Sequence, residues 1–471
     1  MNYGKIDIEI IEKLIEICGE GDVIYKNEEK LENYACDESG KIFCNPPEVV
    51  VKPENTGEVS KIMKLANVYH IPVTPRGAGS GLAGAAIPLY GGIVISMEKM
   101  NRILEIDKTN RVAVVEPGVI TNDLCRKVEE EGLYYAGYPM SVGLSSIGGN
   151  VATNAGGSKV IKYGSTRKHV LGAEVVLPTG EVLNLGGKRR KETWGYDLLD
   201  LLIGSEGTLC IFTKLILNLL PLPKGTVDLL VPFRNIEEAI EAVKALFLEA
   251  KVLPTAIEFM DKTSVDIASQ FLNFSLPLQG NAQAFLIIQI EERSKKELEE
   301  AYEKVGKSCL KNKALDVFVA DNKTNSEKIW RIRRELTEAL RNKDPFVSLS
   351  GDIVVPISEI PIMLKKIKEV EKKYNVKTAT IGHIGDGNLH PALFKPKDVS
   401  PEDWISLSEK IVEELIEEAI KLGGSGSGEH GVGLLKRKTF LKTKPSTEIR
   451  IMREIKRIFD PNMILNPGKV I

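Results

Sequence analysis

The sequence predicts an α+β protein with more than one domain. Its 471 residues are too many for one ordinary hydrophobic core and are typical of two or three domains. Short strands alternate with helices as far as Pro223, and from about Thr226 strands are separated by long helices, which favours antiparallel pairing. From about Ser400 the pattern is helical. We therefore predict a helical N-terminal segment (1–46), a first domain (47–223), a second domain (224–399) and a helical C-terminal segment (400–471).

The patterns expected of a secretory signal and of a membrane span do not occur in the sequence, so we expect a cytoplasmic protein. Ile6, Ile10, Leu14 and Ile17 recur at helical spacing, and Gly19 ends the pattern. A secretory signal would carry basic residues followed by an uninterrupted apolar run. No stretch approaches the roughly 18 apolar residues of a membrane span. The net charge of −2 gives no overall field that would attract nucleic acid or an anionic membrane.

The first domain is predicted to begin with a β-α-β unit. "PEVVVKP" (47–53) is a strand rich in β-branched residues, "TGEVSKIMKLANVYH" (56–70) has apolar residues at helical spacing, and "IPVTP" (71–75) is a second strand. Further along, "GGIVISM", "RVAVVEPG" and "GAEVVLPTGEVLNL" are predicted strands and "NDLCRKVEEEG" is a predicted helix. The alternation ends at Pro221 and Pro223.

The second domain and the C-terminal segment contain longer helices. "VDLLVPF", "AFLIIQIE" and "LDVFVAD" are predicted strands, separated by helices such as "IEEAIEAVKALFLEA" and "KKELEEAYEKVGKSCL". The C-terminal segment has two predicted helices, "SEKIVEELIEEAIKLGG" and "STEIRIMREIKRIF", with a glycine-rich loop between them. We expect this segment to contribute to the functional site and to pack on the first domain.

The six cysteines indicate no metal cluster and no redox motif. They stand at positions 18, 36, 44, 125, 210 and 309, with no C-x-x-C pair and no spacing that would hold iron–sulfur or structural zinc. We expect buried free thiols in a reducing compartment. If the protein moves electrons, it must pass them to a separate partner.

The glycine loop "PRGAGSGLAGA" (75–85) contains a literal G-x-G-x-x-G, the pattern of a dinucleotide-binding Rossmann fold. That fold needs a helix directly after the glycines, because the helix N-terminus holds the pyrophosphate. Here Pro88, Gly91 and Gly92 exclude a helix, and the next predicted element is a strand. The loop can still hold a phosphate through its successive amides. The alternative is a glycine-rich turn without a ligand.

Two further stretches of small residues favour a bound ligand over a glycine-rich turn without one. "SSIGGNVATNAGGSKVIKYG" (145–164) combines glycines with polar side chains, and "LLIGSEGTLCIFTKL" (201–215) is a second small-residue turn that leads into a strand. Glycine allows a backbone to approach a ligand closely. Three such stretches therefore indicate a long ligand that lies along the backbone.

These stretches resemble the FAD-binding domain of flavoproteins related to vanillyl-alcohol oxidase and p-cresol methylhydroxylase. Within that superfamily, the chain from about Pro47 onwards is similar to the FAD-linked D-2-hydroxyacid dehydrogenases, which include D-lactate dehydrogenase, the glycolate oxidase catalytic subunit and D-2-hydroxyglutarate dehydrogenase. The resemblance implies a two-part FAD-binding domain of the vanillyl-alcohol oxidase type and an α+β cap domain with an antiparallel sheet. It implies FAD-binding roles for Pro75, Arg76, Gly77, Ala78, Gly79, Ser80, Gly81, Leu82, Ser146, Gly149, Asn150, Thr153, Asn154, Gly157, Gly164, Gly204, Glu206, Gly207 and Asn466.

Three of the five histidines lie in two glycine-rich loops. "GHIGDGNLH" (382–390) holds His383 and His390, and "SGSGEHGVG" (425–433) holds Glu429 and His430. Imidazoles with a carboxylate suit a divalent metal such as Zn²⁺ or Mn²⁺. The alternative is a hydrogen-bonded loop cluster. The resemblance implies that His383, His390 and Glu429 bind one divalent metal (Zn, Mn or Fe) and that His430 is the general base.

That chemistry suits the oxidation of a 2-hydroxy acid, which requires removal of the hydroxyl proton while the α-hydride leaves. A metal lowers the pKa of a coordinated hydroxyl. An imidazole, with an ordinary pKa of about 6.5, can accept the proton at neutral pH.

The substrate carboxylate calls for a cation, and "WRIRRELTEAL" (330–340) offers Arg331, Arg333 and Arg334 on a predicted helix. Arginines on a helix are usually solvated. The resemblance selects Arg333, with Thr337 one turn later, as the substrate-binding residues. A lysine of D-2-hydroxyglutarate dehydrogenase that holds a second carboxylate corresponds here to Ser350, which favours a small substrate such as D-lactate or glycolate.

Two other departures concern the flavin. The segment "YYAGYPMSVGLSS" (134–146) lacks the proline-rich pattern of relatives, which can alter the surroundings of the flavin. Ser80 stands where covalent members carry a histidine, and no cysteine lies between Gly137 and Gly149, so we expect FAD to be bound non-covalently.

Several functions remain open. The leading hypothesis is oxidation of D-lactate, and the alternatives are a glycolate-oxidising flavin subunit of a larger complex and D-2-hydroxyglutarate dehydrogenase. A metallohydrolase and a non-catalytic flavin-binding scaffold or sensor are hypotheses of other classes. The expected electron acceptor is an electron-transfer flavoprotein or an iron–sulfur subunit.

Overall fold

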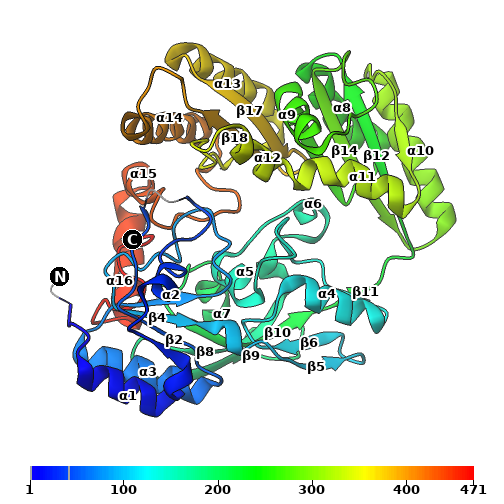
Figure 1. Ribbon diagram of the computed structural model, residues 1–471. Helices are drawn as coiled ribbons and strands as arrows, with labels where there is room; N and C mark the ends of the chain where they lie inside the picture. The colour runs from blue at the N-terminus through cyan, green and yellow to red at the C-terminus, as the bar shows by residue number, and fades with distance from the viewer. Residues whose placement is uncertain (1–2, 41–42) are drawn as a thin grey trace. The chain divides into compact units, whose positions relative to one another are not determined.

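The computed structural model describes residues 3–40 and 43–471, and the chain divides into two compact units. Unit 1 contains Met1–Gly156, Ser165–Leu222 and Glu429–Ile471, and unit 2 contains Gly157–Gly164 and Pro223–Gly428. The units are coloured by residue number in Figure 1. The four segments predicted above rest on sequence pattern, and their boundaries stay predictions.

Unit 1 begins with a four-stranded sheet in the order β1-β2-β4-β3. The strands β2 and β3 pair in parallel with β4, whereas β1 pairs antiparallel with β2. Buried residues of the helices α1 and α3 pack on this sheet in one apolar cluster. The bounds are β1 (Val23–Ile24), β2 (Val49–Val51), β3 (Val73–Arg76), β4 (Ile93–Ser96), α1 (Ile8–Cys18) and α3 (Thr56–Tyr69), so the predicted β-α-β unit is present.

The second sheet of unit 1 has the order β5-β6-β10-β8-β9, and all its neighbours are antiparallel. The helices α4 and α5 contribute to its apolar cluster. The bounds are β5 (Ile103–Asp107), β6 (Val112–Val115), β8 (Val170–Val176), β9 (Val182–Gly186), β10 (Ile211–Asn218), α4 (Thr121–Glu130) and α5 (Ile147–Thr153). A small pair joins β7 (Leu133–Tyr134) to β11 (Leu220–Pro221). Unit 1 also contains α2 (Glu28–Glu32), α7 (Leu198–Leu202), α15 (Arg437–Thr443) and α16 (Ser446–Phe459).

A buried lysine connects α16 to the rest of unit 1. Lys456 Nζ donates to the carbonyl of Thr208 at 2.6 Å, to that of Leu465 at 2.8 Å and to Asp460 Oδ2 at 2.6 Å. Asp460 is fully buried and also accepts the amides of Ile464 and Leu465. Burial lowers the pKa of Lys456, although the Asp460 carboxylate opposes that change. The ion pair therefore holds the C-terminal residues against the loop that precedes β10.

Replacing Lys456 by alanine is expected to lower the free energy of unfolding by about 3 kcal/mol, because it leaves the buried Asp460 carboxylate without its cation. Urea denaturation of the purified variant measures this. Arg457→Ala is the matched control: Arg457 pairs with Glu454 at a largely exposed site and should change stability by less than about 0.5 kcal/mol. Equal effects of the two substitutions would contradict the role of Lys456.

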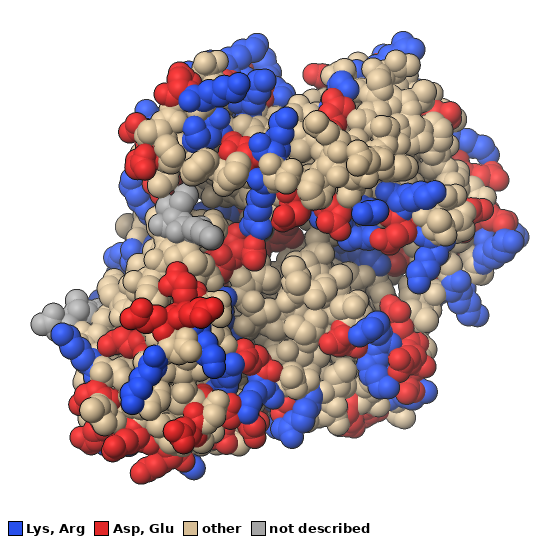
Figure 2. All heavy atoms as spheres, viewed as in Figure 1, with Lys and Arg blue, Asp and Glu red and all other residues tan. Residues whose placement is uncertain are grey.

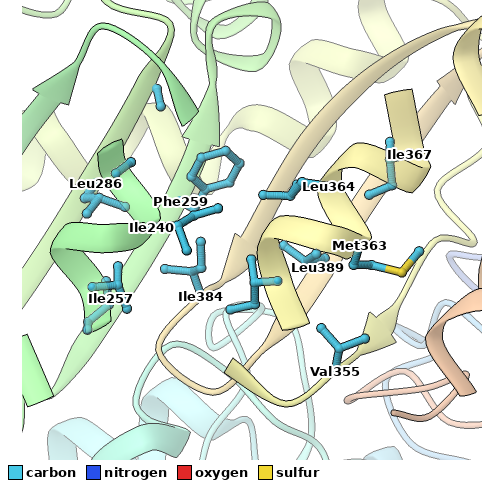
Figure 3. Packing of buried hydrophobic residues seen from close by; sticks show 14 of the residues in the cluster. Ile240, Ile257, Phe259, Leu286, Val355, Met363, Leu364, Ile367, Ile384 and Leu389 are labelled. Carbon is cyan, nitrogen blue, oxygen red and sulfur yellow. The ribbon is translucent and has the colours of Figure 1, made fainter. Parts of the chain in front are cut away.

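Unit 2 is built on a seven-stranded sheet in the order β15-β12-β14-β13-β17-β18-β16, and every pair is antiparallel. One face packs against α8, α10, α13 and α14 in the largest apolar cluster, part of which is shown in Figure 3. The bounds of the strands are β12 (Gly225–Phe233), β13 (Ala256–Asp261), β14 (Ala284–Glu292), β15 (Phe318–Ala320), β16 (Ile353–Val354), β17 (Lys377–His383) and β18 (Asn388–Phe394).

The helices of unit 2 lie on both faces of this sheet. Because side chains alternate along a strand, Ile257 and Phe259 of β13 point into the large cluster, and Glu258 between them points to the face where α9 and α11 lie. The bounds are α6 (Val160–Tyr163), α8 (Ile236–Ala245), α9 (Lys262–Leu272), α10 (Lys295–Lys311), α11 (Lys323–Arg334), α12 (Leu336–Lys343), α13 (Ile360–Tyr374) and α14 (Pro401–Lys421). Trp404 and Ile411 of α14 pack in the apolar cluster of unit 2.

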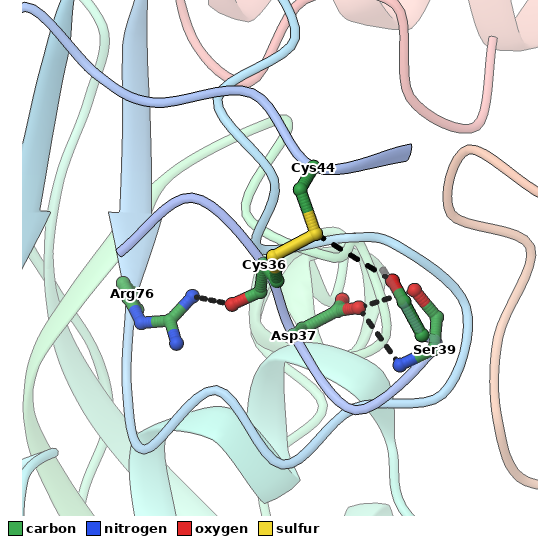
Figure 4. The surroundings of a disulfide bond; sticks show 6 residues. Cys36, Asp37, Ser39, Cys44 and Arg76 are labelled. Atoms are coloured by element: carbon green, nitrogen blue, oxygen red, sulfur yellow. Dashed lines mark hydrogen bonds between the residues drawn. A yellow bond between two sulfur atoms is a disulfide. The ribbon is translucent and has the colours of Figure 1, made fainter. Parts of the chain in front are cut away.

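The structure corrects the expectation for two cysteines. Cys36 and Cys44 form a disulfide, with their Cα atoms 4.7 Å apart (Figure 4). The eight-residue separation carries no motif that would have predicted this bond. Cys18, Cys125, Cys210 and Cys309 are free thiols, as expected, although the first two are only partly buried.

The surface agrees with the near-zero net charge. On the face shown in Figure 2, basic and acidic side chains are interspersed. Among the described residues, none of the helices is long and apolar enough to cross a membrane.

Candidate active site

The glycine loop joins β3 to β4 in unit 1 and contacts the start of α5. Ser146 is the N-cap of α5, and its Oγ accepts a hydrogen bond from the amide of Ala78 at 3.3 Å. A Cβ atom at Gly77 would overlap this hydroxyl, so glycine is required there. The fully described stretch 77–92 contains no helix. This confirms that the G-x-G-x-x-G match does not belong to a Rossmann fold.

A cavity of about 310 Å³ opens beside these residues. Gly77, Ala78 and Ser146 form part of its wall, and Gly118, Val119 and Ile120 form another part. Small residues on these two parts of the wall, together with the larger side chains of Glu98, Asn101 and Asp123, surround a space in unit 1 that a flat or extended ligand can enter. We call this space the cradle, and its glycine-lined wall allows a ligand to approach the backbone closely.

The second small-residue turn contacts the same loop. Asn466 Nδ2 donates to the carbonyls of Glu206 at 2.8 Å and Ala85 at 2.9 Å, and a Cβ at Gly207, where φ is +66°, would approach Pro75. Gly204 donates its amide to Val151 in α5 at 3.1 Å. The structure therefore brings together the three stretches in which most predicted FAD residues of unit 1 lie.

Glu206 bonds to the backbone of the loop that follows His430. Its carboxylate accepts the amides of Val432 at 2.7 Å and Gly433 at 2.8 Å. Burial raises the pKa of Glu206, and the two amides oppose that change. Nearby, burial lowers the pKa of Lys469 to about 8. Glu206 thus holds the loop after His430 beside the glycine loop.

Arg76 and the polar residues of α5 also have partners within unit 1. Arg76 Nη1 donates to the carbonyl of Cys36 at 2.8 Å (Figure 4), and burial lowers the pKa of Arg76. Asn150 donates to Thr121, Thr153 donates to the carbonyl of Gly149, and Asn154 accepts the amide of Arg167. These bonds shape the walls of the cradle. The remaining loop residues Gly79, Ser80, Gly81 and Leu82 are partly or fully accessible.

Gly157 and Gly164 stand apart from this group, because they bound the short segment assigned to unit 2. Within that unit, Lys159 Nζ lies 2.7 Å from Glu291 Oε1, and Tyr163 donates to Glu291 Oε2 at 2.9 Å. These contacts anchor the segment on β14. The FAD-binding roles assigned to individual residues stay predictions.

His383 and His390 face each other in unit 2. His383 ends β17, His390 lies in β18, and the register pairs His383 with Asn388 and His390 with Ile381. Paired residues share a face of the sheet, so both imidazoles project from the same side. Their ring centroids are 5.4 Å apart in an edge-to-face arrangement. The hairpin of β17 and β18 therefore places two imidazoles beside each other on one face of the sheet.

A buried carboxylate connects this pair to Arg333. Glu258 Oε1 lies 2.6 Å from His383 Nδ1, and Glu258 Oε2 accepts from Arg333 Nε at 2.7 Å. Glu258 is fully buried and Arg333 is 6% exposed. The neighbouring Arg331 and Arg334 are exposed. Arg333 therefore differs from Arg331 and Arg334 in being buried, whereas those two side chains are exposed to solvent.

Thr337 lies beyond a break in the predicted helix. The chain leaves α11 at Glu335 and re-enters a helix at Leu336, so Thr337 is in the first turn of α12. Glu335 keeps near-helical backbone angles, with φ −81° and ψ −1°. Ser350 is partly buried in the loop before β16.

Asp352 accepts hydrogen bonds from the glycine-rich loop at 425–433, as far as Gly428. It accepts the hydroxyl of Ser427 at 2.6 Å, the amide of Gly428 at 3.1 Å and Asn388 Nδ2 at 3.0 Å. Its Oδ1 also lies 3.9 Å from His390 Nδ1. Asp352 therefore bonds both to Asn388 in β18, the strand that contains His390, and to Gly428, which directly precedes Glu429.

Glu429 and His430 begin the third segment of unit 1. Glu429 Oε1 lies 3.6 Å from His430 Nε2, and both side chains are about one-seventh exposed. Asp386, which the sequence places between the two histidines of the other loop, accepts the amide of Asn388 and shapes the turn. The metal-binding and catalytic roles of Glu429 and His430 stay predictions.

Sequence reasoning missed Glu258 and Asp352. Each is a carboxylate next to apolar residues, in "AIEFM" and "DIVVP" respectively. Acidic residues are almost never fully buried unless they are paired. An isolated acid within a predicted strand was therefore the available signal, but it does not name the partner.

Comparison with known proteins gives the family. Residues 47–186 match the FAD binding domain family, and residues 222–470 match the FAD linked oxidases, C-terminal domain. The glycolate oxidase subunit GlcD of Bacillus subtilis is 38% identical and is covered over 96% of its length by 98% of this chain. A D-lactate dehydrogenase of Anaerostipes hadrus is 38% identical, with 99% of this chain and 98% of that protein covered.

The solved structure of p-cresol methylhydroxylase has the same fold, with a TM-score of 0.80 over 98% of this chain and 96% of that chain, at 18% identity. The predicted α+β class, with an FAD-binding domain of this type and a cap domain with a large antiparallel sheet, is confirmed. The family matches and the two relatives equally confirm the prediction of an FAD-linked oxidoreductase. The chain belongs to the FAD-linked oxidase family.

Proposed function

We propose that the protein oxidises a small D-2-hydroxy acid, preferably D-lactate, to the 2-oxo acid. The observation that carries the proposal is a group in unit 2, where His383 packs against His390 and is joined through the Glu258 carboxylate to Arg333. Metal-ligand side chains beside a buried guanidinium suit a substrate that carries a hydroxyl next to a carboxylate. The relatives named as D-lactate dehydrogenase and glycolate oxidase subunit support the same chemistry.

The donor set fits a divalent metal. His383 and His390 supply two imidazole nitrogens from one face of a hairpin, and the chain continues directly from Gly428, held by Asp352, to Glu429. Two histidines and a carboxylate are a common ligand set, with positions left for substrate. A divalent ion bound there would lower the pKa of the substrate hydroxyl.

His430 takes the hydroxyl proton in this proposal. His430 Nε2 lies 3.6 Å from Glu429 Oε1, so its imidazole stands beside a proposed metal ligand. Arg333 binds the substrate carboxylate, and Thr337 adds a hydroxyl from the first turn of α12. The glycine loop and the turns around Ser146 and Gly204 would hold FAD, which would supply the hydride acceptor.

We infer the size of the substrate from Ser350, which corresponds to a lysine that holds a second carboxylate in D-2-hydroxyglutarate dehydrogenase. A dicarboxylic acid requires a second cation, and the short hydroxyl of Ser350 supplies none. D-Lactate and glycolate are therefore preferred over D-2-hydroxyglutarate. We also propose that electrons pass to a separate protein, an electron-transfer flavoprotein or an iron–sulfur subunit, because the cysteines form no cluster motif.

Anaerobic mixing of the purified flavoprotein with a panel of D- and L-hydroxy acids tests the proposal. We expect D-lactate to bleach the flavin absorbance fastest, glycolate more slowly, and D-2-hydroxyglutarate and L-lactate least. A flavin that no 2-hydroxy acid reduces would overturn the proposed activity. Fastest reduction by D-2-hydroxyglutarate would overturn the argument from Ser350.

Non-covalent attachment of FAD is a separate expected result. Ser80 lies in the glycine loop and cannot form the bond that a histidine forms at this position in covalent relatives. Acid precipitation should therefore release all the yellow colour into the supernatant, measured by absorbance at the flavin maximum. A yellow pellet would contradict the prediction.

A further inference from the structure

We propose that Glu258 is the positioning residue of this site. It fixes the His383 imidazole for a divalent metal and, through its second oxygen, fixes Arg333 for the substrate carboxylate. The inference rests on the proposed function, because it concerns the metal and the substrate assigned there. Glu258 itself touches neither.

The location of Glu258 makes a partner obligatory. It lies in the middle of β13, its Cα is paired with that of His383 on β17, and none of its surface is exposed. A carboxylate buried inside a sheet is strongly destabilising unless it is hydrogen-bonded and paired with a cation. Arg333 supplies the cation at 2.7 Å and His383 supplies the second partner at 2.6 Å.

The two bonds determine which nitrogen of His383 carries the proton. Glu258 Oε2 accepts from the guanidinium of Arg333, which is always protonated and therefore stabilises the ionised carboxylate. An ionised carboxylate can only accept, so His383 Nδ1 must carry the hydrogen. The other ring nitrogen, Nε2, then keeps its lone pair. A carboxylate behind a histidine is the arrangement that orients metal-binding imidazoles.

The same carboxylate fixes the direction of Arg333. The bond uses Nε, on one edge of the planar guanidinium. The two terminal amino groups, Nη1 and Nη2, form a different edge, which can hold a carboxylate through two parallel hydrogen bonds. A side chain held at Nε has less freedom to lose when it binds substrate. Glu258 therefore orients two side chains that act on neighbouring groups of one substrate.

A neighbouring acid shows what a purely structural role looks like. Asp261, at the end of the same strand, accepts the amide and hydroxyl of Ser264 at the start of α9 and the amide of Thr380. It caps a helix and joins two strands. Glu258 instead bonds to the ends of His383 and Arg333, two side chains that lie 125 and 75 residues away in the sequence.

The test measures metal affinity in the FAD-loaded protein after removal of metal by a chelator. Zn²⁺ is added in competition with a chelator of known affinity, and the dissociation constant is read by calorimetry. Glu258→Gln, which keeps the shape but removes the charge, is expected to weaken Zn²⁺ binding by about 10–100-fold. FAD content should stay normal. The matched control is Asp228→Asn, another buried acid of the same sheet, bonded to Gln289 and Ser326, which should stay within about twofold of wild type.

The outcomes separate this inference from the proposed function. If wild type binds no Zn²⁺, Mn²⁺ or Fe²⁺, the metal assignment fails and this inference fails with it. If wild type binds metal and Glu258→Gln binds it equally well, or Asp228→Asn loses as much, the role of Glu258 is overturned and the metal site stands.

A measurement on the wild-type protein covers a variant that does not fold. ¹⁵N NMR of the histidine rings in the metal-free protein reports the tautomer, and the five histidines keep the spectrum simple. His383 is expected to carry its hydrogen on Nδ1. A hydrogen on Nε2 instead would overturn the inference.

Discussion

His430→Ala is expected to slow flavin reduction by D-lactate by about 10²–10⁴-fold, the usual contribution of a positioned general base. The divalent metal and FAD should both remain, because His430 is assigned to neither. Stopped-flow absorbance gives the rate, and elemental analysis of the same sample gives the metal content. A variant that loses its metal would instead make His430 a ligand.

The controls for this prediction are His383→Ala and His390→Ala. Each should lose the metal together with activity, because a site of three protein ligands holds metal poorly with two. Wild-type protein stripped of metal is the second control. If it turned over at full speed with no detectable metal, the division of roles between the ligands and His430 would be wrong.

Arg333→Ala is expected to lower kcat/KM for D-lactate by about 10²–10³-fold, or about 3–4 kcal/mol, through loss of a charge-assisted bidentate contact. FAD content should be unchanged. Steady-state kinetics with an artificial electron acceptor measures the effect. Arg331→Ala, which changes an exposed arginine of the same helix, should stay close to wild type.

The unfolding temperature must be measured beside the kinetics, because Arg333→Ala also leaves Glu258 without its cation. Arg333→Lys separates the two effects, since lysine keeps the charge but cannot form the planar fork. A kcat/KM near the wild-type value in both variants would move carboxylate binding to another residue.

Local sequence pattern was sufficient for the fold class and for the glycine loop. Pro88, Gly91 and Gly92 exclude a helix whatever the rest of the chain does, and the structure has a loop and then β4 there. The β-α-β unit at 47–75 was also predicted from local pattern, because β-branched residues indicate the strands and apolar residues at helical spacing indicate the helix. Helical spacing also predicted α3, α8, α10 and α16, whose apolar faces are several turns long.

The structural features that the sequence could not predict depend mainly on contacts between segments and on how loops fold. The pairing of Glu258 with His383 arises only from the register of β13 and β17, which local pattern does not specify. The break at Glu335 is a small backbone change without a proline or glycine to signal it. The Cys36–Cys44 bond likewise depends on how the loop folds, so a free pair and a bonded pair look the same in the sequence.

The discontinuity of unit 1 has a consequence for the biosynthesis of the protein. Residues 223–428 separate its second segment from its third. At ordinary elongation rates, a ribosome needs about 10–40 s to make them. During that interval the nascent chain holds two sheets of unit 1 without Lys456 and Asn466, which later bond to the turn around Glu206 and Thr208. The completed polypeptide, rather than the emerging one, is therefore the first species that can close the cradle around its flavin.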